Sequence, residues 1–196
     1  GHPTFATCEK WDGSSWTEVG DINSGRATAA AAGSSTAALL FGGNSPNNAC
    51  EKWDGSSWTE VGDLNTGRNY LFGAGTNTAA ICAGGNPNHA VVEQWNGSSW
   101  TEVGDLNNAR YGLACTSQSP QTSLLAFGGG PPNFVHTEQY DGSSWTEIAD
   151  LATGRQEICG GGTLPSGLAF GSGGTPTNQS TEEWSFSASV ETIAFD

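Results

Sequence analysis

The sequence is poor in basic residues. Only six of its 196 residues are Lys or Arg, against 20 Asp and Glu, and the formal net charge is −14. Nucleic acids and anionic membrane surfaces are bound through clusters of Lys and Arg. We therefore expect neither as a partner, and we interpret the acidity as a contribution to solubility.

Long apolar runs are missing as well. No uninterrupted apolar stretch is long enough to span a bilayer, and the first residues lack the basic and apolar segments of a signal peptide. No stretch of about ten or more residues keeps its apolar positions at the spacing of a helix. The sequence therefore predicts neither membrane insertion nor helices.

The cysteines and histidines form no metal-binding motif. The five cysteines include no CxxC pair and fall in separate repeats, at Cys8, Cys50, Cys82, Cys115 and Cys159. This spacing argues against a disulfide framework or a zinc site, so we expect reduced thiols buried in strands. The three histidines also lie in different repeats, at His2, His89 and His136. We expect no metal site and no cofactor.

The sequence contains four copies of one twelve-residue motif, which we call the phrase. KWDGSSWTEVGD stands at residues 10–21 and again at 52–63, and close variants follow at 94–105 and 139–150. The first aromatic of each phrase, with Trp184 as a fifth, recurs about every 42 to 45 residues. A fixed period of this length is typical of stacked or radially arranged units.

Each period reads as four short strands. A small-residue strand such as NYLFGAG comes first, and a second strand such as AALLFGG ends in a glycine doublet. The third carries Glu-x-Trp, and the fourth reads SWTEVGDL. Gly, Asn, Asp and Ser turns separate these runs, which predicts an all-β fold. Four strands in about 40–45 residues are typical of a β-propeller blade.

We predict a single propeller domain over residues 1–196 with about five blade units. The chain opens halfway through a repeat, so the first unit is half present, and the units are 1–25, 26–67, 68–109, 110–154 and 155–196. The sequence does not determine how the ring of blades closes. The first two strands could complete the last unit and give four blades. Five blades could instead include an incomplete one or one completed by another chain, or residues before Gly1 could be missing.

Three features of the repeat resemble kelch repeats over nearly the whole chain. These are the glycine doublet, the later pair of aromatics such as Trp11 and Trp16, and the Arg that opens the next unit. The wording NGSSWTEVGDLNNAR is similar to kelch-like repeats of predicted structural and tail proteins of marine bacteriophages. The resemblance implies a propeller carried by a virion appendage.

The phrase WDGSSW is expected to form a hairpin. Asp-Gly and Asn-Gly tolerate the positive φ of a tight turn, and the serines can bond its backbone. A calcium site needs six to eight converging oxygens, whereas each phrase offers one carboxylate or, in one copy, an amide. We therefore predict a turn-forming role for Asp12, Asp54, Asn96 and Asp141.

One Arg and one Glu recur at fixed positions in the repeats. Catalysis needs acidic groups in different environments, whereas equivalent positions in successive blades have similar ones. We predict structural ion pairs at the edges of the blades, with the Asp five residues before each Arg as the other possible acceptor. The residues are Arg26, Arg68, Arg110, Arg155, Glu9, Glu51, Glu93, Glu138 and Glu182.

The connections after the glycine doublets differ most among the repeats. In a propeller they emerge on one rim, and function concentrates on loops held by a rigid scaffold. Unconstrained solvent loops are the alternative interpretation. The predicted ligand- or partner-binding residues are His2, Phe5, Asn47, Asn48, Asn88, His89, Asn133, Phe134, His136, Asn178 and Gln179.

These observations favour a non-enzymatic structural or adhesion module of a virion appendage or another extracellular assembly. It would contact protein subunits or a receptor, and copies could associate or exchange strands at exposed edges. A glycan-binding, lectin-like propeller is the first alternative, and an intracellular kelch-type adaptor is the second. We expect no enzyme, because the sequence has no Ser-His-Asp set and no metal-ligand spacing.

Overall fold

The computed structural model describes residues 4–44, 47–173 and 180–185. Within these ranges the chain consists of strands, turns and bends, without a helix. None of the described residues therefore belongs to a helix long and apolar enough to cross a membrane. The prediction of an all-β protein is confirmed.

Three of the sheets have four antiparallel strands each. Their strands are β3 (Ala30–Ser34), β4 (Ala37–Phe41), β5 (Cys50–Trp53), β6 (Trp58–Val61), β7 (Phe72–Gly75), β8 (Ala80–Ala83), β9 (Val92–Trp95), β10 (Trp100–Val103), β11 (Ala114–Cys115), β12 (Leu124–Phe127), β13 (Thr137–Tyr140) and β14 (Trp145–Glu147). We name them blade 1 (β3–β6), blade 2 (β7–β10) and blade 3 (β11–β14), and in each the strands are neighbours in chain order.

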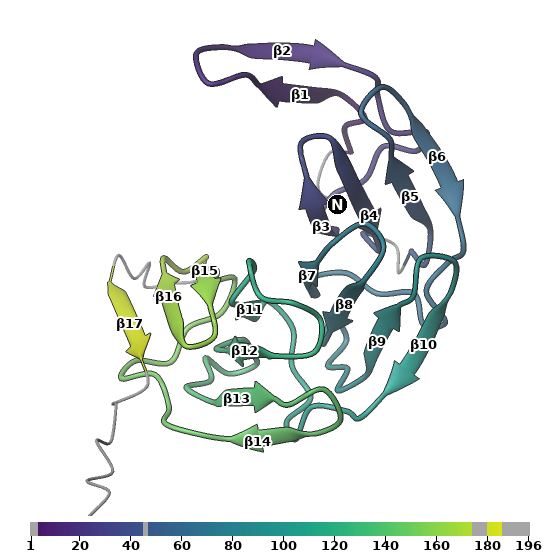
Figure 1. Ribbon diagram of the computed structural model, residues 1–196. Helices are drawn as coiled ribbons and strands as arrows, with labels where there is room; N and C mark the ends of the chain where they lie inside the picture. The colour runs from purple at the N-terminus through teal and green to yellow at the C-terminus, as the bar shows by residue number, and fades with distance from the viewer. Residues whose placement is uncertain (1–3, 45–46, 174–179, 186–196) are drawn as a thin grey trace, which may run out of the picture.

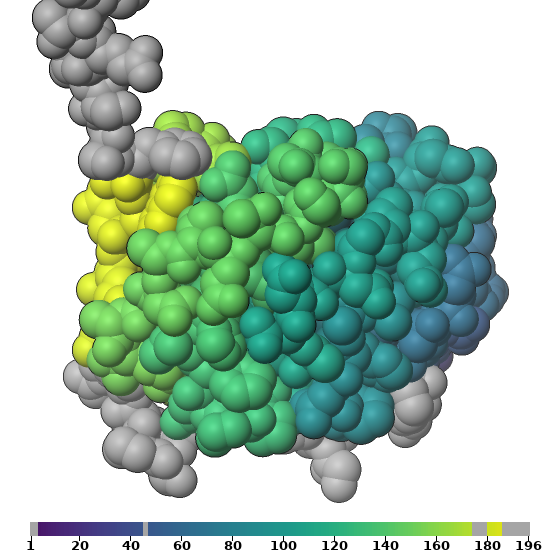
Figure 2. Space-filling view, turned by 90° about the horizontal axis from the view of Figure 1, so that it is seen from below, coloured from purple at the N-terminus to yellow at the C-terminus, as the bar shows by residue number. Residues whose placement is uncertain are grey.

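Two smaller sheets stand at the ends of the chain. The hairpin of β1 (Cys8–Trp11) and β2 (Trp16–Val19) comes first, and blade 4 consists of β15 (Cys159–Thr163), β16 (Ser166–Phe170) and β17 (Thr181–Ser185). Figure 1 shows the sheets following one another around an arc, with β1–β2 at one end and blade 4 at the other. In Figure 2 the yellow strand β17 lies at the flank of the molecule.

The described residues therefore form four blades, and the prediction of about five blade units is wrong in its count. The additional unit was expected from residues 1–25, of which the described part forms only the hairpin β1–β2. Those residues correspond to the third and fourth strands of a repeat. Among the described residues, no first and second strands pair with this hairpin.

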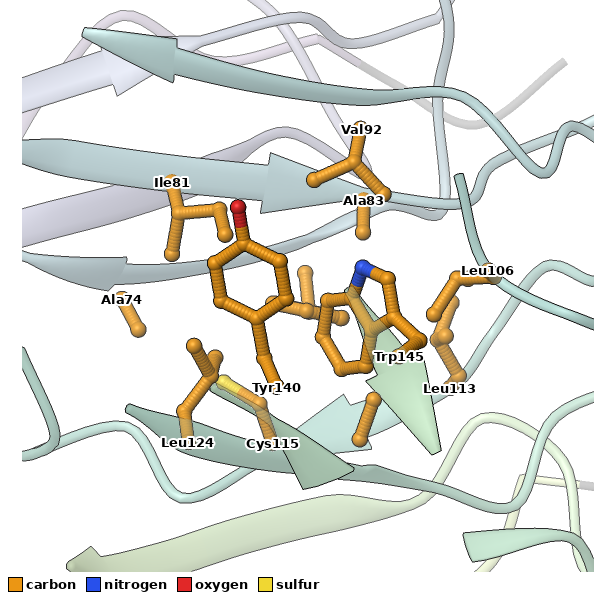
Figure 3. Packing of buried hydrophobic residues seen from close by; sticks show 12 residues of the cluster. Ala74, Ile81, Ala83, Val92, Leu106, Leu113, Cys115, Leu124, Tyr140 and Trp145 are labelled. Carbon is orange, nitrogen blue, oxygen red and sulfur yellow. The ribbon is translucent and has the colours of Figure 1, made fainter. Parts of the chain in front are cut away.

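The two aromatics of each phrase face each other across a strand pair. Trp95 on β9 lies opposite Trp100 on β10, and their ring centroids are 5.5 Å apart. Trp100 also packs edge-on against Phe41 of blade 1, at 4.9 Å between centroids. In blade 3 the corresponding Tyr140 and Trp145 lie in one apolar cluster with Ile81 of blade 2 (Figure 3). The aromatic pair of a blade thus covers the face of the preceding blade.

Only some of the cysteines are buried in the packing between blades. Cys50, Cys82 and Cys115 are buried, Cys8 is half-buried and Cys159 is exposed, and all five are free thiols. Burial raises the pKa of Cys50 and of Cys82 to about 12, so both stay protonated at neutral pH. The expectation of buried thiols fails at Cys159, which begins β15 of blade 4 and is exposed.

The Asp-Gly-Ser-Ser segments form tight turns closed by the aspartate. Asp54 Oδ1 accepts hydrogen bonds from the backbone N–H groups of Ser56 (2.8 Å) and Ser57 (2.9 Å). These bonds lower the pKa of Asp54 to about 2. Asn96 Oδ1 accepts the same pair of bonds at 3.0 Å, so an amide serves as well as a carboxylate. The bonding supports the turn-forming interpretation.

We expect Asp54→Asn to preserve this turn and to remove its sensitivity to acid. The lowered pKa means that the ionised aspartate stabilises the turn above about pH 4 and that this contribution is lost as the pH falls toward 2. Backbone amide NMR shifts of Ser56 and Ser57 between pH 5 and pH 2 would measure the change. The Asn96 turn of the same molecule is the internal control, and an acid response there equal to that at Asp54 would contradict the assignment.

Buried ion pairs fix the connections between blades. Arg68 Nη2 lies 2.9 Å from Glu93 Oε1, and both side chains are fully buried. The other carboxylate oxygen of Glu93 accepts bonds from the backbone N–H (2.7 Å) and side-chain amide (2.9 Å) of Asn65. Asn and Arg stand three residues apart, so one short segment holds the carboxylate from both sides. We call this arrangement the clamp.

The clamp recurs at each blade. The remaining ion pairs are Arg26–Glu51, Arg110–Glu138 (3.0 Å) and Arg155–Glu182 (2.7 Å). At Glu51 and Glu138 the carboxylate accepts hydrogen bonds from the backbone N–H and the side-chain amide of Asn23 and Asn107, respectively. Glu182 accepts instead a backbone N–H bond from Ala152, which has no side-chain amide. Each Arg therefore pairs with a Glu of its own blade, and the Asn of the incoming connection makes the contact between blades. The Asp alternative is not used: Asp63 Oδ1 instead accepts the Cys50 N–H at 3.3 Å.

We expect Arg68→Ala to lower the free energy of unfolding by about 3–5 kcal/mol, because it leaves Glu93 buried without a counterion. The matched change Arg155→Ala should cost less, since 23% of the Glu182 side chain is already exposed to water. Urea unfolding followed by Trp fluorescence measures both. Equal losses at the two positions would contradict the idea that burial sets the value of the pair.

Candidate functional site

The variable connections share one backbone frame. At the same position of four connections, a carbonyl oxygen accepts the backbone N–H of the clamp arginine at 3.2 Å. The pairs are Phe5 with Arg26, Asn47 with Arg68, His89 with Arg110 and Phe134 with Arg155. The frame is constant while the side chain that it carries changes from Phe to Asn, His and Phe. The rim formed by these connections therefore carries side chains of different chemistry at structurally equivalent positions.

The predicted binding residues of the rim lie in separate loops. Phe5 is 67% exposed, and Asn48, Asn88 and Asn133 are exposed, while Asn47, His89, Phe134 and His136 are half-buried. The structure brings the rings of Phe134 and His136 together, with centroids 5.4 Å apart. The predicted residues His2, Asn178 and Gln179 lie outside the described residues.

One group of side chains in the described part of the chain has donors spaced for a cation. His136 Nδ1 lies 3.1 Å from Glu147 Oε1 and 4.0 Å from Asp150 Oδ1. Asp150 Oδ1 also accepts the Thr137 N–H at 3.2 Å, the bond that Asp63 makes to Cys50 in blade 1. This carboxylate therefore has a structural partner in its strand pair. His89 lies in another loop, and burial, followed by the charge of Arg68, lowers its pKa.

A second feature lies on the inner side of the arc, where the first strand of each blade begins. The residue two positions after each clamp arginine has a left-handed backbone: Thr28 (φ 57°), Tyr70 (φ 54°), Gly112 (φ 62°) and Glu157 (φ 50°). Only Gly adopts this region freely, and a β-branched residue such as Thr is an outlier there. Strain of this kind is concentrated at functional sites.

Backbone hydrogen bonds connect the first three of these residues and the neighbour of the fourth. Tyr70 N–H donates to the Thr28 carbonyl (3.0 Å), Gly112 N–H donates to the Tyr70 carbonyl (2.8 Å), and Ile158 N–H, next to Glu157, donates to the Gly112 carbonyl (3.4 Å). Together with Ala29, Leu71, Leu113 and Ile158 they line a pocket of about 290 Å³. We call it the axial pocket.

The axial pocket combines polar groups from three blades over an apolar floor. Thr28 supplies a hydroxyl, Tyr70 a phenol and Glu157 a carboxylate, and Leu71, Leu113 and Ile158 supply the floor. A small polar ligand with one apolar face, such as a sugar ring, suits this set of groups. Sequence reasoning missed these residues. The only signal in the sequence is that the position two after each Arg varies among Thr, Tyr, Gly and Glu.

The fold defines a class of protein, the β-propellers. Among solved structures, that of YjhT is similar to this chain, with a TM-score of 0.70 and 15% sequence identity, over 85% of this chain and 66% of that one. The chain thus spans slightly less than two thirds of YjhT, and at this identity the likeness shows the fold alone. No protein family and no curated protein matches the sequence.

We expect Glu157→Gly to raise the free energy of unfolding by about 1 kcal/mol, because glycine relieves the strain of the left-handed backbone. Gly112→Ala, at the same position of blade 3, is the matched control. It should destabilise, since a Cβ there would lie 2.9 Å from the Glu157 nitrogen. Urea unfolding of both variants measures the effects. A loss of stability in Glu157→Gly would show that the side chain is kept for packing.

Proposed function

We propose that the protein is a non-enzymatic adhesion module of an extracellular assembly such as a virion appendage, and that its rim contacts a receptor. The observation that carries this proposal is the constant backbone frame at Phe5, Asn47, His89 and Phe134 with its changing side chains. In blades 2 and 3 the aromatic residues of the repeated Trp phrase are buried in the packing between blades, whereas in the first copy Trp11 and Trp16 are exposed. The resemblance of the repeats to kelch-like phage proteins supports the location.

The axial pocket favours glycan binding as a second candidate function. Its phenol, hydroxyl and carboxylate can pair with sugar hydroxyls, and a Tyr ring can stack on a sugar face. Tyr70 follows the clamp Arg68, whose backbone is bonded to the rim residue Asn47, so the pocket and the rim belong to one surface. The residues lining the pocket include a single carboxylate, Glu157.

The test is the binding of fluorescently labelled protein to a panel of marine bacterial cells. We expect the rim variant Phe5→Ala/Asn133→Ala to bind at least about tenfold more weakly, a loss of about 1.4 kcal/mol. The control Thr36→Ala/Thr78→Ala alters the turns between the first and second strands, at the opposite end of the blades, and should bind like the parent. Loss of binding after periodate oxidation of the cells, together with loss in Tyr70→Ala, would identify a glycan. Equal binding by the rim variant and the parent would contradict the proposal.

A further inference from the structure

An imidazole and two carboxylates converge on the outer strand pair of blade 3, β13 and β14 (Figure 1). His136 stands directly before β13, Glu147 ends β14, and Asp150 follows three residues later. His136 Nδ1 lies 3.1 Å from Glu147 Oε1 and 4.0 Å from Asp150 Oδ1. We propose that these three side chains bind a divalent transition-metal ion such as zinc. This goes beyond the proposed function, which requires no metal.

Backbone hydrogen bonds tie the segment that carries His136 to the segment that carries the two carboxylates. On one side of the histidine the Val135 carbonyl accepts the Leu151 N–H at 2.9 Å. On the other side the Thr137 carbonyl accepts the Ile148 N–H at 3.0 Å. The donor groups are therefore held close together before an ion binds, and a metal site depends on such support from its surroundings.

The charges at this point favour a divalent cation. Among the ion pairs of the described residues, Glu147 and Asp150 occur only with His136, because the arginines pair with other glutamates. When the imidazole is neutral, the site carries the negative charges of its two carboxylates, and one divalent ion balances them. The net charge of −14 also attracts cations to the surface of the protein.

The kinds of donor atom select the class of metal. Imidazole nitrogen and carboxylate oxygen are both zinc ligands, and in a tetrahedral site such donors lie roughly 3.3 Å apart. The distance of 3.1 Å between His136 and Glu147 is close to this value. Asp150 has a second oxygen that can bind the ion while Oδ1 keeps its bond to the Thr137 N–H. Calcium and magnesium prefer oxygen ligands, so the imidazole favours zinc over them.

The equivalent point of blade 1 shows what the histidine adds. Glu60 and Asp63 repeat the two carboxylates there, but Ala49 stands where blade 3 has His136. The carbonyl of Ala49 accepts bonds from the clamp arginine and from the glycine after the second strand, as that of His136 does. Asp63 Oδ1 accepts the Cys50 N–H. The backbone and the carboxylates thus belong to the repeat, and the imidazole is an addition in blade 3.

Titration of the untagged protein with Zn²⁺ at neutral pH, measured by isothermal titration calorimetry, tests the proposal. Cys8 and Cys159 are not fully buried and thiolates also bind zinc, so every variant carries Cys8→Ser and Cys159→Ser. We expect about one Zn²⁺ to bind per chain. His136→Val should weaken this binding at least about tenfold, because the loss even of a group that only supports a metal ligand costs that much.

Matched variants in blades 1 and 3 separate a defined site from general attraction of cations to an acidic surface. Glu147→Gln should weaken zinc binding, whereas Glu60→Gln, at the same position of blade 1, should leave the affinity unchanged. Ala49→His gives blade 1 the missing imidazole and should raise the stoichiometry to about two ions per chain. In NMR spectra zinc should shift the imidazole resonances of His136 and leave those of His89 in place.

Three results would overturn the proposal. The first is the absence of zinc binding by the parent. The second is equal zinc affinity of the parent and of His136→Val, when both unfold alike in urea without metal. The third is calcium binding as tight as zinc binding, because it would show an acidic surface without a nitrogen ligand. The rim variant Phe5→Ala/Asn133→Ala should bind zinc like the parent, so failure of this proposal and failure of the adhesion proposal are distinguishable.

Discussion

The rest of the structure depends on one interaction, the buried pair of an arginine and a glutamate at each blade. Removing two charges from water is costly, and such a pair is stable only when further hydrogen bonds satisfy both groups. Here the carboxylate receives the guanidinium on one oxygen and an Asn backbone and amide on the other. The same few residues connect one blade to the next. The clamp therefore sets the position of each blade relative to its neighbour.

The clamp also places the candidate site. The arginine backbone N–H is bonded to the variable rim residue, and the left-handed residue stands two positions further along the chain. The segment between is short, so fixing the guanidinium leaves little freedom at either point. The rim and the axial pocket are therefore both positioned by the connection that carries the clamp arginine. Their side chains can change without disturbing the packing of the aromatic pairs.

Much of the fold could be predicted because it depends on local pattern and repetition. The Glu-x-Trp strands, the Asp-Gly turns and the recurrence of Arg carry their own signals. The number of blades could not be predicted, because residues 1–25 have the sequence of half a blade and only the tertiary structure shows that none of the other described strands pairs with them. The axial residues were missed for another reason. Thr, Tyr and Glu do not indicate a left-handed backbone, so local preference does not account for the conformation at Thr28, Tyr70 and Glu157.

The buried ion pairs and aromatic pairs of the junctions between blades also bear on the effect of the large negative charge. Two chains of −14 repel each other at a distance, but at physiological ionic strength this repulsion is screened beyond about 8 Å. A buried arginine–glutamate pair and a buried Trp pair are little affected by salt. The acidity thus opposes non-specific association while leaving contacts of the internal type intact.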